Sequence, residues 1–474
     1  MKKFRYGLLA AAGLLLITGG IAGGCGWAGF KLVSGVLDNR TDLVERYYPG
    51  VARCGKGIPL TAKLKQILNG TYIVLLQNNN ELRATGGFAG SYAKLKFEKG
   101  GLQSVTVQDI YEPDGKLPGH VEPPYPIQEA FGQGWWKLRD ANWDADFASA
   151  AATVDWFMRQ GGEETAAGIA AVNLDLMEKW VAVFGEVEVT TYGVKVTKEN
   201  LYALAQTYAE TRTEGEKTQK RGFLGALGTA LMERTRAAGW QEMVKIGKVI
   251  WEELKKGQVL VWVKDPEVQA ELRKLGWTGN LTGSWAGAGD LVYVVDTNLG
   301  ANKSDCCIVR QLQQEVEGNG EKQRVRLTIS RQNNNPYESP KPPFSFGGRY
   351  VDYVRVIIPS GATELKRVTV KGKELREMAE TETPNSLRQG RSEDEYATEI
   401  RGEVRSIGFW LVVEAGETGT AEVEWESGRM RGNEYEVLVR RQPGVESFWY
   451  GLTVNGRMQA ETELDRDREF RVRW

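Results

Sequence analysis

Residues 78–92, NNNELRATGGFAGSY, contain the side chains of this chain that are best suited to binding an anion. The stretch follows an apolar run at 72–76 and precedes a run at 92–97 in which apolar and polar residues alternate. Both runs have the composition of β-strands, so residues 78–92 are predicted to form a polar loop that connects two strands.

Two glycines and one arginine make this loop a candidate anion-binding site. Gly86 and Gly87 carry no Cβ and can adopt positive φ, which lets the backbone approach a ligand closely. Arg83 beside exposed amides would then bind an anion. The alternative is an ordinary strand connection in which Glu81 and Arg83 are simply solvated, and the local sequence leaves both open.

Length and charge restrict the class of protein. A chain of 474 residues is long enough for two or three domains, each with a sizeable core. Lys and Arg number 61 against 62 acidic residues, and this net charge of −1 argues against nucleic acid as a partner. The 15 tryptophans suit cores, and they also suit carbohydrate or protein contacts.

Histidine and cysteine usage narrows the chemistry further. His120 is the one histidine, so a Ser-His-Asp triad would have to use it, and a histidine-rich zinc site is excluded. The four cysteines, Cys25, Cys54, Cys306 and Cys307, include no C-x-x-C pair, which argues against zinc-ribbon and thioredoxin folds. Adjacent cysteines rarely bond to each other, so in an oxidising compartment Cys54 could pair with Cys306 or Cys307.

The N-terminal residues predict a membrane anchor. Lys2, Lys3 and Arg5 precede an uncharged run at 6–30, roughly 25 residues, which is enough to span a bilayer. The basic residues favour a cytoplasmic N-terminus, with the bulk of the chain extracytoplasmic on a single-pass cell-membrane protein. A cleaved signal peptide and a lipoprotein anchored at Cys25 are the alternatives, and each of them also exports the remaining chain.

Beyond the anchor, the pattern of hydrophobic residues predicts an α/β domain followed by a β-rich domain. Strand-like runs alternate with amphipathic helices up to about residue 300, which indicates a mixed sheet covered by helices. Past residue 305, short alternating runs such as RVRLTIS predict a β-sandwich. We therefore expect an anchor with a cytoplasmic tip (1–31), a juxtamembrane stalk (32–68), an α/β domain (69–304) and a β-sandwich-like domain (305–474).

The predicted strands of the α/β domain are 71–77, 91–97, 102–108, 168–172, 187–196, 259–263 and 291–296. Helices are expected around 147–158, 174–184, 197–208, 223–231 and 243–254, because apolar residues recur there at helical spacing. We interpret these stripes as core rather than as cofactor sites.

Several segments in a fixed order closely resemble a bacterial family. They are NNNELRATGGFAGSY (78–92), DIYEPDG (109–115), LRDANWDADF (138–147), QKRGFL (219–224), VKDPEVQAELRKLGW (263–277) and VVDTNLGANKSD (294–305). The family is domain of unknown function 4012. The resemblance covers nearly the whole chain, including the N-terminal anchor and RRQPG at 440–444, but the family name implies no activity.

The order of elements at about 69–260 also resembles the LytR-CpsA-Psr family of membrane-anchored, extracytoplasmic α/β enzymes. That family transfers glycopolymers from a polyprenyl-pyrophosphate carrier to cell-wall peptidoglycan with Mg²⁺. The resemblance matches Arg83 to a base at the first turn and Asp109 to the acid that ends a Pro-Arg-Asp strand. Lys220 and Arg221 match a basic helix. Two positions depart from that family, because Gly86-Gly87 replaces the acid of the first turn and Gln108 replaces the arginine.

The chemistry of attack on a polyprenyl pyrophosphate, which this resemblance suggests, gives roles to particular residues. Arg83, Arg139, Asp109 and Asp140 would be catalytic. Arg83, Gly86, Gly87, Lys220 and Arg221 would bind the lipid pyrophosphate, since cations and open backbone suit a diphosphate. Asp109 and Asp114 would hold Mg²⁺, because hard carboxylate oxygens suit that ion, and Asn142 would orient one of these groups.

Each assignment has a structural alternative. Arg139-Asp140 is equally consistent with a buried pair that pins the segment before a helix, Asp114-Gly115 with a turn, and Lys220-Arg221 with a solvated helix face. Two functions follow: glycopolymer transfer from polyprenyl-linked glycan to cell-wall polymer, or a non-catalytic envelope protein that uses its β-rich domain for polymer or protein contacts. The transferase requires these cations and acids to meet at one apolar cleft.

Overall fold

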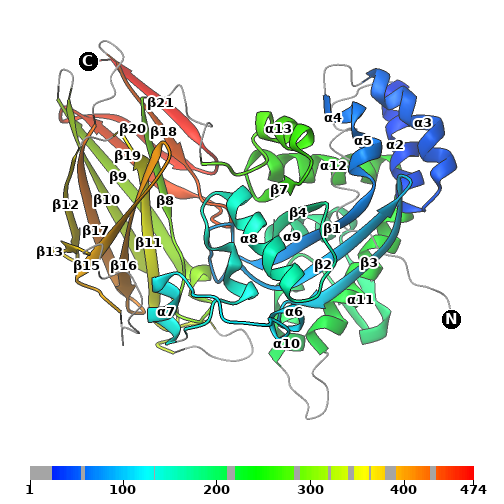
Figure 1. Ribbon diagram of the computed structural model, residues 1–474, viewed down its shortest axis with the longest axis horizontal. Helices are drawn as coiled ribbons and strands as arrows, with labels where there is room; N and C mark the ends of the chain where they lie inside the picture. Colours follow the sequence, from blue (N-terminus) through cyan, green and yellow to red (C-terminus); the bar gives the residue numbers. More distant parts are fainter. Residues whose placement is uncertain are drawn as a thin grey trace. The chain divides into compact units, whose positions relative to one another are not determined.

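The computed structural model describes residues 24–54, 59–132, 134–210, 219–281, 289–318, 322–339, 346–361, 364–378, 391–427 and 434–473. These residues form two compact units, which are coloured along the chain in Figure 1. Unit 1 comprises the described parts of Met1–Asn78, Ala89–Pro118 and Phe147–Gly279, and unit 2 comprises those of Asn79–Phe88, Gly119–Asp146 and Asn280–Trp474. Unit 2 therefore includes the glycine loop and the segment 119–146, both of which were expected in the α/β domain.

Unit 1 is a mixed α/β fold, as the sequence predicted. Its five-stranded sheet has the order β3-β2-β1-β4-β7. β1 runs parallel to β4, whereas β2 with β3 and β4 with β7 pair antiparallel. The strands are β1 (Gly70–Asn78), β2 (Phe88–Glu98), β3 (Gly101–Asp109), β4 (Gly168–Asn173) and β7 (Val259–Val263), and β5 (Val187–Val189) and β6 (Val194–Val196) form a separate hairpin.

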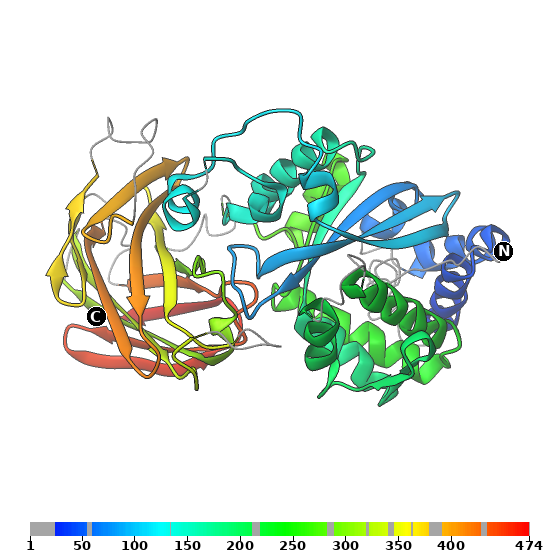
Figure 2. The ribbon, with the colours of Figure 1, turned by 90° about the horizontal axis from the view of Figure 1, so that it is seen from below.

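Helices cover both faces of this sheet (Figure 2), and each of the five predicted helices is present. The apolar stripes are buried as expected: Phe147, Val154 and Phe157 of α8 are at most 1% exposed, as is Trp180 of α9. The helices are α6 (Tyr111–Asp114), α8 (Phe147–Gln160), α9 (Leu174–Phe184), α10 (Leu201–Glu210), α11 (Gln219–Arg236), α12 (Trp240–Lys255) and α13 (Pro266–Lys274).

The N-terminal helices belong to the core of unit 1 rather than to a separate stalk. They are α2 (Gly24–Leu37), α3 (Thr41–Cys54), α4 (Pro59–Ala62) and α5 (Leu64–Ile67). Leu32, Val36 and Val51 are fully buried in the same hydrophobic cluster as Val74 of the sheet. Most of the expected membrane-spanning run 6–30 lies outside the described residues, and among the described helices none is long and apolar enough to cross a membrane.

Unit 2 is built from two sheets with the orders β13-β12-β17-β10-β9-β19-β20 and β14-β15-β16-β11-β8-β18-β21. Its helices are α7 (Tyr125–Phe131) and the 3-10 turns η1 (Leu138–Trp143) and η3 (Ser304–Cys307). The strands are β8 (Asp290–Val295), β9 (Ile308–Glu317), β10 (Gln323–Asn333), β11 (Tyr350–Pro359), β12 (Glu364–Val370), β13 (Lys373–Glu374), β14 (Arg376–Glu377), β15 (Glu395–Arg401), β16 (Val404–Val413), β17 (Thr418–Ser427), β18 (Glu434–Arg440), β19 (Phe448–Val454), β20 (Arg457–Leu464) and β21 (Arg468–Arg473).

One hydrophobic core joins the two sheets of unit 2. Val325, Leu327 and Ile329 of one sheet and Val354 and Val356 of the other are buried together. β8, which the sequence assigned to the α/β domain, lies between β11 and β18 in the second sheet. The boundary between units consequently falls after Gly279 and not at residue 304.

The structure also settles one cysteine pairing. Cys306 and Cys307 form a disulfide with each other, and their Cα atoms are 3.8 Å apart in the turn η3. A bridge from Cys54 to either of them is therefore wrong. The side chains of Cys25 and Cys54 lie outside the described residues.

Candidate functional site

The glycine loop 79–88 is a compact turn within unit 2. The amide of Phe88 donates to Glu81 O at 2.8 Å, and the amide of Gly86 donates to Arg83 O at 3.0 Å. Gly86 has a φ of 132°, so this position requires the freedom of glycine, whereas Gly87 is not among the described residues with positive φ. The loop is hydrogen-bonded to itself and is buried from Leu82 to Gly87.

Arg83 is neither solvated nor open to a ligand, in contrast to both expectations for it. Its side chain is 3% exposed. Nη1 donates to Asn298 O at 2.6 Å and to Leu82 O at 3.1 Å, and Nη2 lies 3.4 Å from both Asp140 Oδ1 and Glu81 Oε1. The guanidinium therefore joins three segments of unit 2, because a buried arginine must be paired with acceptors.

The segment 138–142 supports the glycine loop. Asp140 is 7% exposed and forms ion pairs with both Arg83 and Arg139. The Nε of Arg139 lies 3.7 Å from Asp140 Oδ2. Asn142 Nδ2 donates to Gly87 O at 2.9 Å and to Thr85 Oγ1 at 3.1 Å. This arrangement corresponds to the structural alternative for Arg139-Asp140, in which the pair pins the chain ahead of α8.

The other candidate residues belong to unit 1. Asp109 ends β3 and accepts a hydrogen bond from the amide of Tyr111 at 3.0 Å. Asp114 ends α6 and is 4% exposed. Lys220 and Arg221 lie in the first turn of α11, but their side chains are outside the described residues. The structure thus unites Arg83, Arg139 and Asp140 in unit 2, and it assigns Asp109, Asp114, Lys220 and Arg221 to a different unit.

The donor set does not fit the expected magnesium site. Mg²⁺ prefers near-octahedral oxygen coordination, usually with one or two carboxylates among its ligands. Asp114 is buried, and one oxygen of Asp109 is engaged by its own chain. Within the described residues, no group of three His, Cys, Asp or Glu side chains is arranged to hold a metal.

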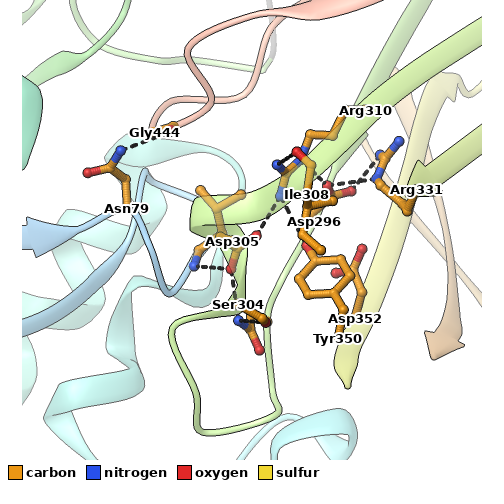
Figure 3. Close-up of polar contacts among 12 residues, drawn as sticks. Asn79, Asp296, Ser304, Asp305, Ile308, Arg310, Arg331, Tyr350, Asp352 and Gly444 are labelled. Carbon is orange, nitrogen blue, oxygen red and sulfur yellow. Dashed lines mark hydrogen bonds and ion pairs between the residues drawn. The ribbon is translucent and has the colours of Figure 1, made fainter. Parts of the chain in front are cut away.

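A buried ionic network next to the glycine loop was not anticipated from the sequence (Figure 3). Asp296 accepts from Arg310 Nε at 2.7 Å and from Arg331 at 2.7 and 2.9 Å. Arg310 also contacts Asp305 and donates to Tyr350 Oη at 3.2 Å. Each of these five side chains is less than a tenth exposed, and the two arginines balance the charges of Asp296 and Asp305 within the core.

Asp305 connects this network to the glycine loop. Its Oδ2 accepts from the amide of Leu82 at 2.9 Å and from Asn298 Nδ2 at 2.8 Å. Its own amide donates to Asn80 O at 3.2 Å. The sequence did carry a signal, because Arg310 and Arg331 fall in the same alternating register as the buried apolar residues Leu312, Val316, Leu327 and Ile329 of their strands.

The charges of the network shift the pKa values of its acids in opposite directions. Burial would raise the pKa of Asp296, but the positive charges of Arg331 and Arg310 outweigh burial and lower it to about 2. Burial raises the pKa of Asp352 well above its usual value, and the negative charge of Asp296 raises it further. The two arginines therefore favour the ionised form of Asp296, whereas burial and the charge of Asp296 favour the protonated form of Asp352.

An exposed surface on the segment 119–137 offers different chemistry. Trp135 is 52% exposed. The ring of His120 lies edge-on to it, with centroids 5.3 Å apart, and Lys137 Nζ lies 5.2 Å from the centroid of the indole. His120 Nε2 also contacts Gly134 O. We call Trp135, His120 and Lys137 the indole platform.

The indole platform is held on a rigid support. The amide of Trp136 donates to Val121 O at 2.6 Å and so joins the two ends of the segment. Ile127 of α7 packs against Tyr353 and Trp410 of the second sheet. Glu129 accepts from Trp410 Nε1 and from a serine hydroxyl, each at 2.9 Å. Polar and apolar contacts therefore fix α7 to the β-sandwich, while the indole faces solvent.

Comparisons with known proteins add a family but no activity. Residues 69–209 match the sequence profile of a family described as protein of unknown function, domain of unknown function 4012. Over these residues the match supports the first of the two resemblances, which was expected along nearly the whole chain, and the likeness to LytR-CpsA-Psr enzymes is not shown. No functionally curated protein matches the sequence.

Solved structures give only weak likenesses. A candidate nutrient-binding protein of Legionella pneumophila is 8% identical over 35% of this chain and 54% of its own, with a TM-score of 0.22. An M1 zinc metallopeptidase of Deinococcus radiodurans is 10% identical over 31% of each chain, with a TM-score of 0.17. This chain thus covers about half or less of each, and the low scores support no argument about function.

Proposed function

We propose that this chain, with its segment of domain of unknown function 4012, is a membrane-anchored, extracytoplasmic envelope protein that binds cell-wall glycan through unit 2. The observation that carries the proposal is the indole platform. A tryptophan that is 52% exposed presents a flat apolar face on which the C–H face of a sugar ring can stack. Lys137 Nζ, which lies over one face of the indole, adds a positive charge, which suits a polymer that carries acidic groups.

Binding has more support than transfer because of where the charged residues lie. A diphosphate that approached Arg83 would have to displace Asn298 O and Asp140 from a guanidinium that is 3% exposed. Breaking such a buried pair costs several kcal/mol, on the order of 3–5. Four other residues of the transferase hypothesis, Asp109, Asp114, Lys220 and Arg221, belong to unit 1.

Cosedimentation of the purified protein with isolated cell-wall sacculi tests the proposal. Trp135→Ala should weaken binding about tenfold, which corresponds to about 1.4 kcal/mol. Trp156→Ala is the matched control, because Trp156 is 39% exposed on α8 of unit 1 and should leave binding unchanged. Lys137→Met should reduce binding at low salt and have less effect at high salt, because ions screen exposed charges.

Two results would overturn the proposal. The first is equal binding by the wild type and Trp135→Ala. The second is covalent transfer of labelled glycan from a polyprenyl-pyrophosphate carrier to sacculi that stops in a folded Asp109→Asn variant. That second result would restore the transferase as the better explanation.

A further inference from the structure

The N-terminal ends of α2 and α12 together present apolar side chains that unit 1 does not bury. Trp27 is 55% exposed, Trp240 41% and Val244 49%. Phe30 connects the two helices, with its ring centroid 5.7 Å from that of Trp27 and 5.8 Å from that of Trp240. Both helices are labelled in Figure 1. We call Trp27, Phe30, Trp240 and Val244 the aromatic patch.

The aromatic patch lies on helix faces that the core does not use. Trp240, Val244 and Lys248 follow one another at four-residue spacing on α12 and share one face. A different face of α12 is buried through Met243, Ile246, Ile250 and Leu254. A helix of a soluble protein usually carries polar residues on its outer face, so two adjacent large apolar residues there indicate a contact beyond the fold.

Basic residues surround the aromatic patch. Lys31 Nζ lies 4.7 Å from the centroid of Trp27 and 5.8 Å from that of Phe30. Lys245 and Lys248 are exposed on α12 next to Val244. Tryptophan together with lysine is the composition of protein surfaces at the membrane–water interface, where the indole lies among headgroups and the ammonium meets phosphate.

The position of the aromatic patch along the chain identifies what covers it. The uncharged residues 6–23 precede α2 directly. In helical form these residues would measure about 27 Å, close to the hydrocarbon thickness of about 30 Å. Trp27 lies four residues past Gly23, about 6 Å further along a helix, and this is the depth of the headgroups.

The remainder of α2 ties the aromatic patch rigidly to unit 1. Leu32, Val33 and Val36 are at most 1% exposed in the core cluster of the unit. Within the described residues, α2 therefore runs from Gly24 into the core of unit 1 as one helix without an intervening loop. A membrane anchor joined in this way restricts how unit 1 can tilt against the bilayer.

We propose that the aromatic patch rests in the headgroup layer of the bilayer and holds unit 1 in one orientation on the membrane surface. Its ligand is phospholipid, and anionic lipid is favoured because Lys31, Lys245 and Lys248 border the patch. The inference rests on the membrane anchor of the proposed function and is independent of glycan binding.

Photocrosslinking of the full-length protein in phosphatidylglycerol and phosphatidylcholine vesicles tests this inference. A benzophenone amino acid replaces Trp240 in one variant and Trp156 in the control, which is a similarly exposed tryptophan on α8. Mass spectrometry should find a phospholipid adduct at position 240 and none at position 156. Adding Val244→Gln and Trp27→Gln should reduce the adduct at position 240, and omitting phosphatidylglycerol should reduce it as well.

The inference is overturned if position 240 gives no lipid adduct, gives as much as position 156, or crosslinks only to protein. Extraction of the vesicles at alkaline pH separates two kinds of failure. Protein that stays in the membrane without a lipid adduct at position 240 refutes the aromatic patch and leaves the anchor intact. Protein that is extracted and gives no adduct refutes both.

Discussion

Gly444 meets the carbonyl of Gly86 so closely that a Cβ on Gly444 would lie 1.8 Å from Gly86 O. Gly444 also has a φ of 85°, and its carbonyl accepts from Asn79 Nδ2 at 3.3 Å (Figure 3). The backbone of the glycine loop thus contacts the backbone of the turn at 443–444, which ends the RRQPG segment, within unit 2. The glycines there serve close packing, because any side chain would separate the two segments.

Gly444→Ala should strongly destabilise unit 2. The new Cβ would overlap the Gly86 carbonyl, and the positive φ would add roughly 1–2 kcal/mol of strain. Gly416→Ala is the matched control, because Gly416 has a φ of 81° and a Cβ added there would meet nothing within 4 Å. Thermal unfolding should show a much larger fall in Tm for Gly444→Ala, and equal falls would show that the two segments do not pack as described.

Arg83→Met should destabilise the protein rather than remove a binding function alone. The substitution leaves Asp140 and Asn298 O without their buried partner, which costs on the order of 3–5 kcal/mol. Arg473→Met is the control, because Arg473 is 86% exposed in its pair with Glu434 and should change stability by less than about 0.5 kcal/mol. Urea unfolding measures both, and a stable Arg83→Met protein would make Arg83 a candidate ligand-binding residue again.

Asp352→Asn should stabilise the protein increasingly as pH rises. Burial and the charge of Asp296 raise the pKa of Asp352, so the folded state binds more protons than the unfolded state above the unfolded pKa of about 3.9. The contribution of Asp352 to the free energy of unfolding is therefore fully present below the unfolded pKa, and it is lost as pH rises through the folded pKa. The variant does not titrate, so its advantage should grow from about pH 4 upward in urea unfolding.

Asp296→Asn is the control, because its effect on stability should change with pH in the opposite direction. The folded pKa of Asp296 is lowered to about 2 by two arginines against the effect of burial. The stabilisation that ionised Asp296 contributes is present above its unfolded pKa and disappears as pH falls toward 2. Asp296→Asn should therefore lower the free energy of unfolding most at neutral pH. A difference between wild type and Asp352→Asn that does not change with pH would contradict the assigned protonation.

Leu32→Ala should destabilise unit 1 by about 2–5 kcal/mol, because it removes a fully buried side chain from the core. A residue of a solvated stalk would tolerate the same change. Ser34→Ala on the same helix is the control and should have little effect, because Ser34 is only partly buried and its hydroxyl contacts the exposed Asp38. Proteolysis at sites within unit 1 reports the difference without requiring reversible unfolding.

The sequence predicted the elements well where their signal is local. The expected strand at 71–77 corresponds to β1, Gly70–Asn78, and that at 259–263 corresponds to β7, Val259–Val263. Alternation of apolar and polar residues also identified the β-rich part, because a strand that is half buried repeats every two residues. Neither pattern could show that Asp290–Val295 pairs with β11 and β18, since the strand is buried at every position and carries no alternation.

The sequence by itself determined the succession of helices and strands, the change from an α/β to a β-rich composition, and the glycine at position 86 that the loop needs. Only the tertiary structure decided what Arg83 does, because its nearest acceptor, Asn298 O, is 215 positions away along the chain. Periodicity reports which face of an element is buried, whereas the partner of a buried charge depends on how distant segments pack. The arginine that the sequence offered as an anion-binding group is therefore paired with acceptors of its own chain.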